Sequence, residues 1–218
     1  MTGDSPAAGP AMQAGRASSY KLASILLQYP TQELFAGIDA LSSAVRSGPG
    51  KPRAHLTRFL DWLQVTPPHE VAQHYVETFD LRRRTALYLT YYRHGDTRRR
   101  GMALLAFKTA YRAAGMELAG GDLPDHLPVV LDFAAIAPQG EELLRRHRAD
   151  LELLRRALRE DRTPYVHVID AVCAMLPRLR RADVLRIRAA EVKGPPAEEV
   201  GLAPFAPPGY LTGQEVSR

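Results

Sequence analysis

The chain is short of cysteine and of long apolar runs. Cys173 is the only cysteine among 218 residues, which excludes an internal disulfide and a thiolate metal cluster and suits a reducing cytosol. No window approaches the roughly 18 apolar residues that a membrane span needs. The first 19 residues lack the apolar core of a signal peptide. We therefore predict a cytoplasmic protein with no direct membrane insertion, in which Cys173 fills a buried helical face.

Sequence patterns typical of catalysis and of metal binding are also missing. HEVAQH is similar to the zinc-protease helix motif, but His69 and His74 are five residues apart, which separates them by roughly 140° around a helix. The sequence contains no Walker phosphate loop, no G-x-G-x-x-G after a strand and no G-x-S-x-G elbow. We predict that the protein is not an enzyme and holds neither a metal nor a cofactor.

The charge balance is mildly basic. The 29 lysines and arginines exceed the 24 aspartates and glutamates, which gives a formal net charge of +5. A basic chain can bind nucleic acid or an anionic membrane surface. Here the excess is mostly arginine, in short runs interleaved with acidic residues, which favours solvated helix faces. We predict no nucleic-acid partner, and a helical nucleic-acid-binding regulator remains the alternative.

Apolar residues recur at the spacing of a helix through most of the chain. This periodicity predicts an all-α protein, a single globular bundle of about eight to ten helices that spans residues 18–192. Residues 1–17 are rich in Gly, Pro, Ala and Ser and are expected to be disordered. Residues 193–218 form a Pro/Gly-rich C-terminal tail, so both termini should be flexible.

Prolines and capping residues predict where helices begin and end. Pro67 and Pro68 can start a helix that continues to about Asp80, because a proline costs little in the first turn. Asp96 is suited to cap a long helix, and Gly115 is suited to end it.

Three other segments have apolar patterns from which we predict helices. The apolar stripes over 34–45 and 144–158 each predict one continuous helix. Residues 87–92, LYLTYY, have strand character. Because a single strand has nothing to pair with in a helical chain, we interpret this segment as a short helix.

Two blocks of the sequence, residues 74–101 and residues 122–128, mix aromatic residues, charges and helix-start signals. This mixture is typical of a surface that binds another polypeptide. In the second block, DLPDHLP, Asp125 is expected to be the N-cap of a helix, which leaves His126 exposed at the helix mouth. Pro124 and Pro128 flank this pair, and Pro128 is tolerated in the first turn. Taken alone, the pattern is explained better by Asp125 as a plain cap and His126 as a plain surface residue.

The first block, residues 74–101, supplies an aromatic wall. Its candidate client-binding side chains are Tyr75, Phe79, Tyr88 and Tyr91, since tyrosine offers apolar area together with a hydroxyl group at low entropic cost.

Charges and a glycine accompany this wall. Arg98, Arg99 and Arg100 fall in the first turn of a helix, where the macrodipole disfavours a cation, so they invite a partner: Asp96, Asp80, Glu77 or a bound acidic group. Gly101 costs about 1 kcal/mol inside a helix relative to Ala, which suggests close approach by a neighbouring helix. Structural packing is the plain alternative for each of these residues.

Three strings together resemble the NarJ-type nitrate reductase molybdenum-cofactor assembly chaperones. They are YKLASILLQYP, YVETFDLRRRTALYLTYYRHGDTRRRG and DLPDHLPVVLDF, and the resemblance covers about residues 18–178. The wider family of redox-enzyme maturation chaperones includes the TorD and DmsD types.

The resemblance implies an all-helical cytoplasmic chaperone without catalytic activity. Such chaperones bind the catalytic α subunit of respiratory nitrate reductase, including its N-terminal peptide. They hold it ready for molybdenum-cofactor insertion and complex assembly and do not remain in the final enzyme. The family motif places Asp125 and His126 near the peptide groove and, more weakly, Tyr75, Phe79 and Tyr88.

Overall fold

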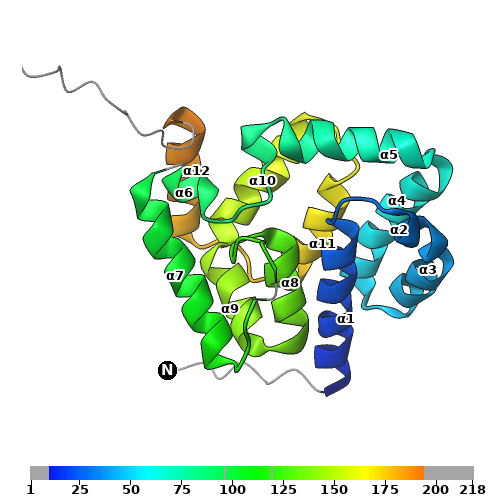
Figure 1. Ribbon diagram of the computed structural model, residues 1–218, viewed down its shortest axis with the longest axis horizontal. Coiled ribbons are helices and arrows are strands. Elements are labelled where there is room, and N and C mark those ends of the chain that lie inside the picture. Colours follow the sequence, from blue (N-terminus) through cyan, green and yellow to red (C-terminus); the bar gives the residue numbers. More distant parts are fainter. Residues whose placement is uncertain (1–9, 96, 119, 194–218) are drawn as a thin grey trace, which may run out of the picture.

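The computed structural model describes residues 10–95, 97–118 and 120–193 (Figure 1). Over these residues the chain forms twelve α-helices, ten of them eight residues or longer, and no strand, which confirms the all-α prediction. The helices are α1 (Pro10–Leu26), α2 (Gln32–Ala36), α3 (Ile38–Ser47), α4 (Gly50–Val65), α5 (Pro68–Tyr75), α6 (Tyr91–His94), α7 (Arg98–Ala113), α8 (Leu127–Ile136), α9 (Pro138–Arg146), α10 (Arg148–Glu160), α11 (Val166–Met175) and α12 (Arg181–Lys193). A π-helix, η1 (Val76–Asp80), and a 3-10 turn, η2 (Arg83–Thr85), connect α5 to α6.

One hydrophobic core joins these helices. α1 stands between α8 on one side and α3 and α4 on the other, and α11 packs against α4 (Figure 1). Leu27, Phe59, Leu131 and Tyr165 are each at most 1% exposed. Burying a side chain of this size contributes about 1.5–3 kcal/mol, so the core is the main source of stability. No helix within the described ranges has both the length and the apolarity needed to cross a bilayer.

Local signals position several helix ends as predicted. Pro68 lies in the first turn of α5, and the helical path continues through η1 to Asp80. Gly115 follows the end of α7 with φ +73°, a conformation that glycine adopts without strain. The prediction that Asp96 caps the long helix was wrong, because the N-cap position of α7 is Thr97; Asp96 itself lies outside the described residues.

The N-terminal helix is longer than expected. α1 begins at Pro10, so residues 10–17, which the sequence suggested would be disordered, are helical. Once the buried face of α1 has docked, each further residue adds one backbone hydrogen bond at little cost. Arg16 also forms an ion pair of 2.7 Å with Glu141 on α9. The expectations for residues 1–9 and for the C-terminal tail lie outside the described residues, apart from Lys193, which ends α12.

Both long apolar stripes are interrupted, so the prediction of two continuous helices was wrong. Gly37 separates α2 from α3, and His147 separates α9 from α10. The His147 ring shares a hydrogen bond of 2.8 Å with Asp150, which stabilises a new helix start at Arg148. A break of one residue preserves the apolar spacing, and periodicity therefore does not reveal it.

The segment 87–92 is only partly helical. Leu87–Leu89 pairs with Asp125–Leu127 through an isolated bridge, whereas α6 provides the expected short helix from Tyr91 onward. The pairing consists of Leu89 N–H to Asp125 O at 3.1 Å and Leu127 N–H to Leu87 O at 2.7 Å. The strand character was therefore meaningful, and its partner is a proline-flanked segment that has no strand signal of its own.

Candidate functional site

The two sequence blocks meet at this short backbone pairing. Tyr88 and His126 face each other across an isolated antiparallel bridge, with ring centroids 5.2 Å apart. Residues 74–101 and 122–128, separate in the sequence, therefore form one structural unit.

Asp125 lies inside this unit and does not cap the helix. Its side chain is fully buried, and His126 occupies the N-cap position of α8. The Asp125 Oδ2 atom accepts hydrogen bonds from the Thr90 N–H at 3.0 Å and the Thr90 hydroxyl at 2.6 Å. The Arg100 guanidinium lies 3.6 Å from the same oxygen. The predicted N-cap role was wrong because these tertiary partners hold the carboxylate inside. We call this group of Asp125, Thr90 and Arg100 the carboxylate clamp.

His126 is less exposed than expected. Only 18% of its side chain is accessible, because the ring packs against Tyr88. Its Nδ1 atom lies 3.9 Å from Asp122 Oδ1. Burial lowers the pKa of His126 despite the nearby Asp122 and Asp125 carboxylates, which raise it. The ring is therefore neutral at pH 7.

A small cavity of about 300 Å³ opens beside the clamp. Its lining consists of Phe79, Asp80, Arg82, Arg83, Ala86, Tyr88, Tyr91 and Arg100. The structure thus brings together four of the residues selected from the sequence: Phe79, Asp80, Tyr88 and Tyr91. We call this space the aromatic cavity.

In the aromatic cavity the guanidinium group of Arg100 lies over two tyrosine rings. The Arg100 guanidinium carbon lies 5.3 Å from the Tyr88 ring centroid and 5.9 Å from that of Tyr91. Such cation–π contacts contribute about 0.5–2 kcal/mol and hold the arginine at the rim. Tyr88 is half-buried, whereas Phe79 and Tyr91 expose only an edge. The cavity can therefore accept an apolar side chain beside a positively charged group.

The π-helix η1 delivers two residues to this cavity. Leu81 N–H donates to Val76 O at 3.1 Å, the five-residue hydrogen bond that widens a helical turn. Phe79 and Asp80 end this widened turn, and Phe79 packs on Tyr165 in the core at 4.8 Å between ring centroids. Turns of this kind are rare and frequently occur at functional sites.

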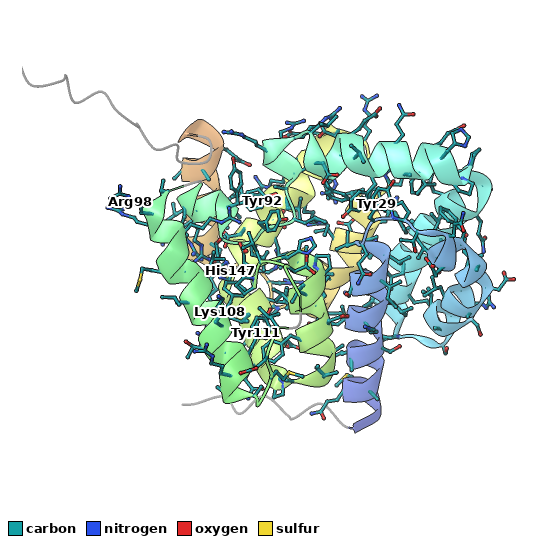
Figure 2. All side chains as sticks on the ribbon, in the orientation of Figure 1. Tyr29, Tyr92, Arg98, Lys108, Tyr111 and His147 are labelled. Atoms are coloured by element: carbon teal, nitrogen blue, oxygen red, sulfur yellow. The ribbon has the colours of Figure 1, made fainter. Side chains whose placement is uncertain are left out.

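Tyr75 and Tyr92 support the cavity from within. Tyr75 is 7% exposed, and its hydroxyl donates to Leu27 O at 3.1 Å, so it lies in the core behind Phe79. Tyr92 points inward from α6 (Figure 2), and its hydroxyl donates to Ala86 O at 3.0 Å. Burial raises the pKa of both hydroxyl groups, which keeps them protonated donors.

Pro124, Pro128, Arg98 and Gly101 do not line the aromatic cavity. The Tyr111 hydroxyl donates to Pro124 O at 2.8 Å, and Pro128 lies in the first turn of α8. Arg98 is the first residue of α7 and points outward from the bundle (Figure 2). The expected close approach at Gly101 was wrong, because a Cβ atom there would meet nothing within 4 Å.

The sequence reasoning did not name Thr90, and it named Arg100 only as one of three arginines expected to have an acidic partner. Arg100 belongs to a run of three arginines, and nothing in the run indicates which one faces inward. Thr90 is fully buried, yet a threonine in a strand-like segment carries no signal for a buried carboxylate partner.

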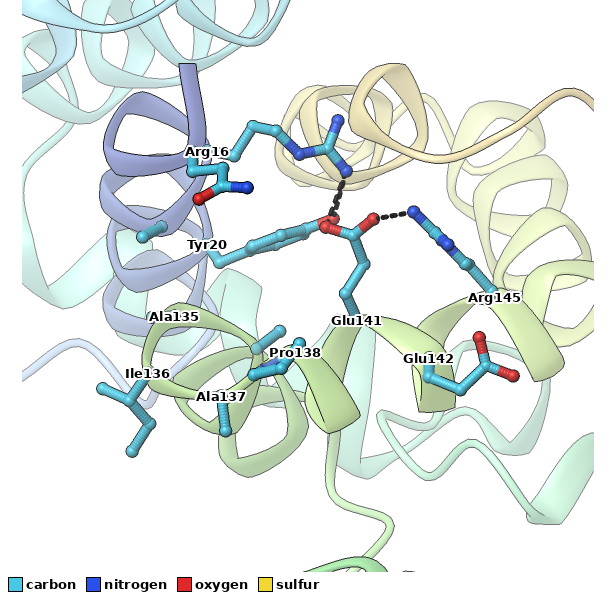
Figure 3. A pocket seen from close by; sticks show the side chains of 12 residues that line it. Arg16, Tyr20, Ala135, Ile136, Ala137, Pro138, Glu141, Glu142 and Arg145 are labelled. Carbon is cyan, nitrogen blue, oxygen red and sulfur yellow. Dashed lines mark hydrogen bonds and ion pairs between the residues drawn. The ribbon is translucent and has the colours of Figure 1, made fainter. Parts of the chain in front are cut away.

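A second cavity, of about 490 Å³, lies between α1 and the α8–α9 connection (Figure 3). Arg16 and Arg145 both reach Glu141, and Arg16 lies 3.4 Å from the Tyr20 hydroxyl (Figure 3). These guanidinium groups lower the pKa of Glu141 against the opposing effect of burial. The carboxylate is already paired, and none of the residues selected from the sequence lines this cavity.

One side-chain group in the described residues has the spacing of a metal site. The ligand atoms of His55, His167 and Asp170 lie within 4.8 Å of one another. Asp170, however, already accepts hydrogen bonds from Arg155 and Arg159. These guanidinium charges oppose a cation, so we assign no metal to this group.

Comparison with known proteins identifies the fold class first. The bundle matches the crystal structure of an Archaeoglobus fulgidus protein described as a redox enzyme maturation protein, with a TM-score of 0.55 and 19% identity. The match covers 72% of this chain and 91% of that one, and at this identity it establishes the fold alone.

The family follows from the sequence. The chain belongs to the nitrate reductase delta subunit family, whose model matches residues 47–170. This range contains the whole aromatic cavity and the carboxylate clamp.

Three relatives give the range of similarity. The nitrate reductase-like protein NarX of Mycobacterium tuberculosis is 41% identical over 156 residues, which are 71% of this chain and 24% of NarX. The chain therefore spans about a quarter of that relative. The nitrate reductase molybdenum cofactor assembly chaperone NarJ of Escherichia coli K12 is 33% identical, over 68% of this chain and 65% of NarJ. The Bacillus subtilis protein named NarJ is 28% identical, over 75% and 91%.

Proposed function

We propose that this protein is an assembly chaperone for a respiratory nitrate reductase. It binds the catalytic α subunit, holds it competent for molybdenum-cofactor insertion and complex assembly, and does not remain in the final enzyme. Family membership carries the proposal, together with the name of the Escherichia coli NarJ relative, which is that of a molybdenum cofactor assembly chaperone.

The aromatic cavity is the proposed contact for the N-terminal peptide of the client. A space of about 300 Å³ suits one or two side chains of an amphipathic helix rather than a whole cofactor. Tyr88 and Tyr91 offer apolar contact. The lining holds three arginines, Arg82, Arg83 and Arg100, beside the carboxylate of Asp80, and two of them are engaged, Arg82 by Asp161 and Arg100 by Asp125. The cavity therefore favours an apolar anchor residue with an acidic neighbour.

The proposed roles of Asp125 and His126 follow from their positions. Asp125 is fully buried and acts through Thr90 and Arg100, so it positions the cavity without touching the client. His126 supports the Tyr88 ring. Tyr75 supports Phe79 from the core, at 4.9 Å between ring centroids.

The structure offers little support for the alternative of a nucleic-acid-binding regulator. Many arginines are engaged by carboxylates, as in the ion pairs of Arg84 with Glu160 at 2.9 Å and of Arg93 with Asp150 at 2.8 Å. A nucleic-acid surface needs cations that are available to phosphates.

Calorimetric titration of the full chain with the N-terminal peptide of the client tests the proposal. Ordering the peptide costs about 2–5 kcal/mol, so we expect a micromolar Kd. Tyr88→Ala should weaken binding at least tenfold, because tyrosines at the centre of an interface typically contribute more than 1 kcal/mol.

Two matched controls separate the cavity from the general surface. Leu105→Ala removes an exposed apolar side chain on α7, and Arg112→Ala removes an arginine outside the aromatic cavity. Equal losses in Tyr88→Ala and Leu105→Ala would contradict the assigned cavity. Capture of the intact α subunit without any peptide binding would retain the chaperone role and reject the N-terminal peptide as its ligand.

A further inference from the structure

A basic cavity of about 450 Å³ lies where α6, α9 and α10 meet the segment that leads into α12. Seven arginines, two carboxylates and one proline line it, and none of the lining residues is aromatic. We call this space the arginine cavity. Arg93 on α6 lines it, whereas Tyr91 on the same helix lines the aromatic cavity.

Hydrogen bonds to the backbone fix two arginines in its wall. Arg93 donates to Arg146 O at 2.6 Å and to Asp150 Oδ1 at 3.2 Å. Arg148 is 8% exposed and donates to Pro177 O at 3.3 Å, which ties α10 to the segment before α12. The cationic wall is therefore positioned in advance of any ligand, which lowers the entropic cost of binding.

The carboxylates in the arginine cavity are already engaged. Glu142 pairs with Arg146 at 3.0 Å, and Asp183 pairs with Arg186 while accepting the Arg180 N–H at 3.0 Å.

Two further arginines remain available at the rim. Among the described residues, no carboxylate oxygen lies within 4 Å of the guanidinium nitrogens of Arg178 or Arg180. Both side chains are exposed at the edge of the cavity. Five of the seven arginines pair with carboxylates, namely Arg93 with Asp150, Arg145 with Glu141, Arg146 with Glu142, Arg148 with Glu152 and Arg186 with Asp183. The uncompensated positive charge of the arginine cavity is therefore that of Arg178 and Arg180 at its rim.

We propose that the arginine cavity binds a diphosphate group, either as free pyrophosphate or as the diphosphate of a small nucleotide. The planar guanidinium fork matches phosphate oxygens two at a time. A single carboxylate would neutralise only one of the two uncompensated charges of Arg178 and Arg180, whereas a diphosphate can neutralise both and still offer oxygens to the paired arginines of the wall.

The lining also distinguishes this ligand from a nucleic acid. Single-stranded nucleic acids are bound by aromatic side chains on which the bases stack, and the arginine cavity offers none. Recognition should therefore depend on the phosphates alone, so nucleotides with different bases should bind equally well. This inference does not rest on the proposed chaperone function, because the two sites are lined by different residues.

Titration of the full chain with sodium pyrophosphate, by calorimetry and by thermal unfolding, tests the proposal. We expect one site per chain, affinity that falls as salt is added, and the same affinity for ADP and GDP. At about one hundred times its Kd, pyrophosphate should raise the Tm by roughly 5–10 °C.

Paired variants locate the site. The double substitution Arg178→Ala and Arg180→Ala should weaken pyrophosphate binding at least tenfold, and because both side chains are exposed the fold should be retained. Arg188→Ala is the matched control, since Arg188 is exposed on α12 and does not line the cavity. Its affinity should stay within twofold of the unmodified chain.

Three outcomes would overturn the proposal. The first is no pyrophosphate binding by the unmodified chain. The second is an equal loss in the double variant and in Arg188→Ala, which would indicate a diffuse charge effect. The third is tighter binding of a single-stranded oligonucleotide than of pyrophosphate, with a steep salt dependence, which would identify a nucleic-acid surface.

Discussion

Removing the Asp125 carboxylate should destabilise the whole protein, although the side chain lies at a candidate site. Asp125→Ala leaves the Thr90 N–H and hydroxyl without an acceptor in a fully buried position. Each unsatisfied buried donor costs about 1–3 kcal/mol, and breaking a buried charge pair costs about 3–5 kcal/mol. These costs overlap, so we expect a net loss of about 3–5 kcal/mol in the free energy of unfolding.

Urea unfolding followed by far-UV circular dichroism measures this loss. For a domain of this size, 1 kcal/mol corresponds to roughly 2–4 °C in Tm, so Asp125→Ala should lower the Tm by roughly 10 °C. Asp125→Asn keeps one oxygen acceptor for Thr90 and should lose less than the alanine variant. Asp122→Ala is the control, because the Asp122 side chain is 68% exposed and its change should stay within about 0.5 kcal/mol.

Thr90, which hydrogen-bonds to Asp125 within the carboxylate clamp, provides an independent check. Thr90→Val removes the hydroxyl donor, so a double-mutant cycle with Asp125→Asn should show coupling of about 1 kcal/mol or more. A loss below about 1 kcal/mol for Asp125→Ala, or additive effects in the cycle, would refute the assigned role of the carboxylate clamp.

Three further predictions concern other parts of the molecule. Burial lowers the pKa of His126 below its ordinary value of 6.5, so the unfolded chain takes up a proton first as the pH falls. Stability should therefore decline below about pH 6.5, and His126→Gln should reduce that decline in urea unfolding between pH 5 and 7.5; an unchanged pH profile would contradict it. Gly101→Ala should raise the free energy of unfolding by about 1 kcal/mol, because the added methyl group meets open space. Gly140→Ala should lower it by more than about 2 kcal/mol, because the new Cβ atom would lie 2.3 Å from Ala134 N. Thermal unfolding that ranks the two variants in the opposite order would refute this. Burial raises the pKa of the Cys173 thiol to about 11, so a thiol reagent at pH 8 should label it only after denaturation, and fast labelling of the native chain would show that the thiol is accessible.

The parts of the fold that the sequence predicts depend on local physics. Helical spacing, Pro68 in a first turn and Gly115 after a last turn each report on a few neighbouring residues. The breaks at Gly37 and His147 were missed because a break of one residue leaves the apolar stripe almost in phase. Counting stripes therefore predicts the class of fold better than the number of helices.

The candidate site was predictable in composition but not in geometry. Phe79, Tyr88 and Tyr91 do share a cavity, as the clustering of aromatic residues suggested. The direction of the Asp125 side chain was predicted wrongly because a local rule for helix caps competed with a partner 35 residues away. A buried carboxylate needs hydrogen-bond donors, and the place of those donors depends on the tertiary fold.

The carboxylate clamp also explains how the aromatic cavity keeps its shape although the elements around it are short. The helix α6 has only four residues, and the pairing of Leu87–Leu89 with Asp125–Leu127 is a single isolated bridge. Neither element is stable alone, since isolated helices shorter than about 12 residues and lone pairs of strands are marginal in water. Asp125 joins the two through Thr90, the residue immediately before α6, and its neighbour Arg100 covers the rings of Tyr88 and Tyr91. The position of the exposed cavity rim is therefore set by a carboxylate that no client can reach in the folded protein.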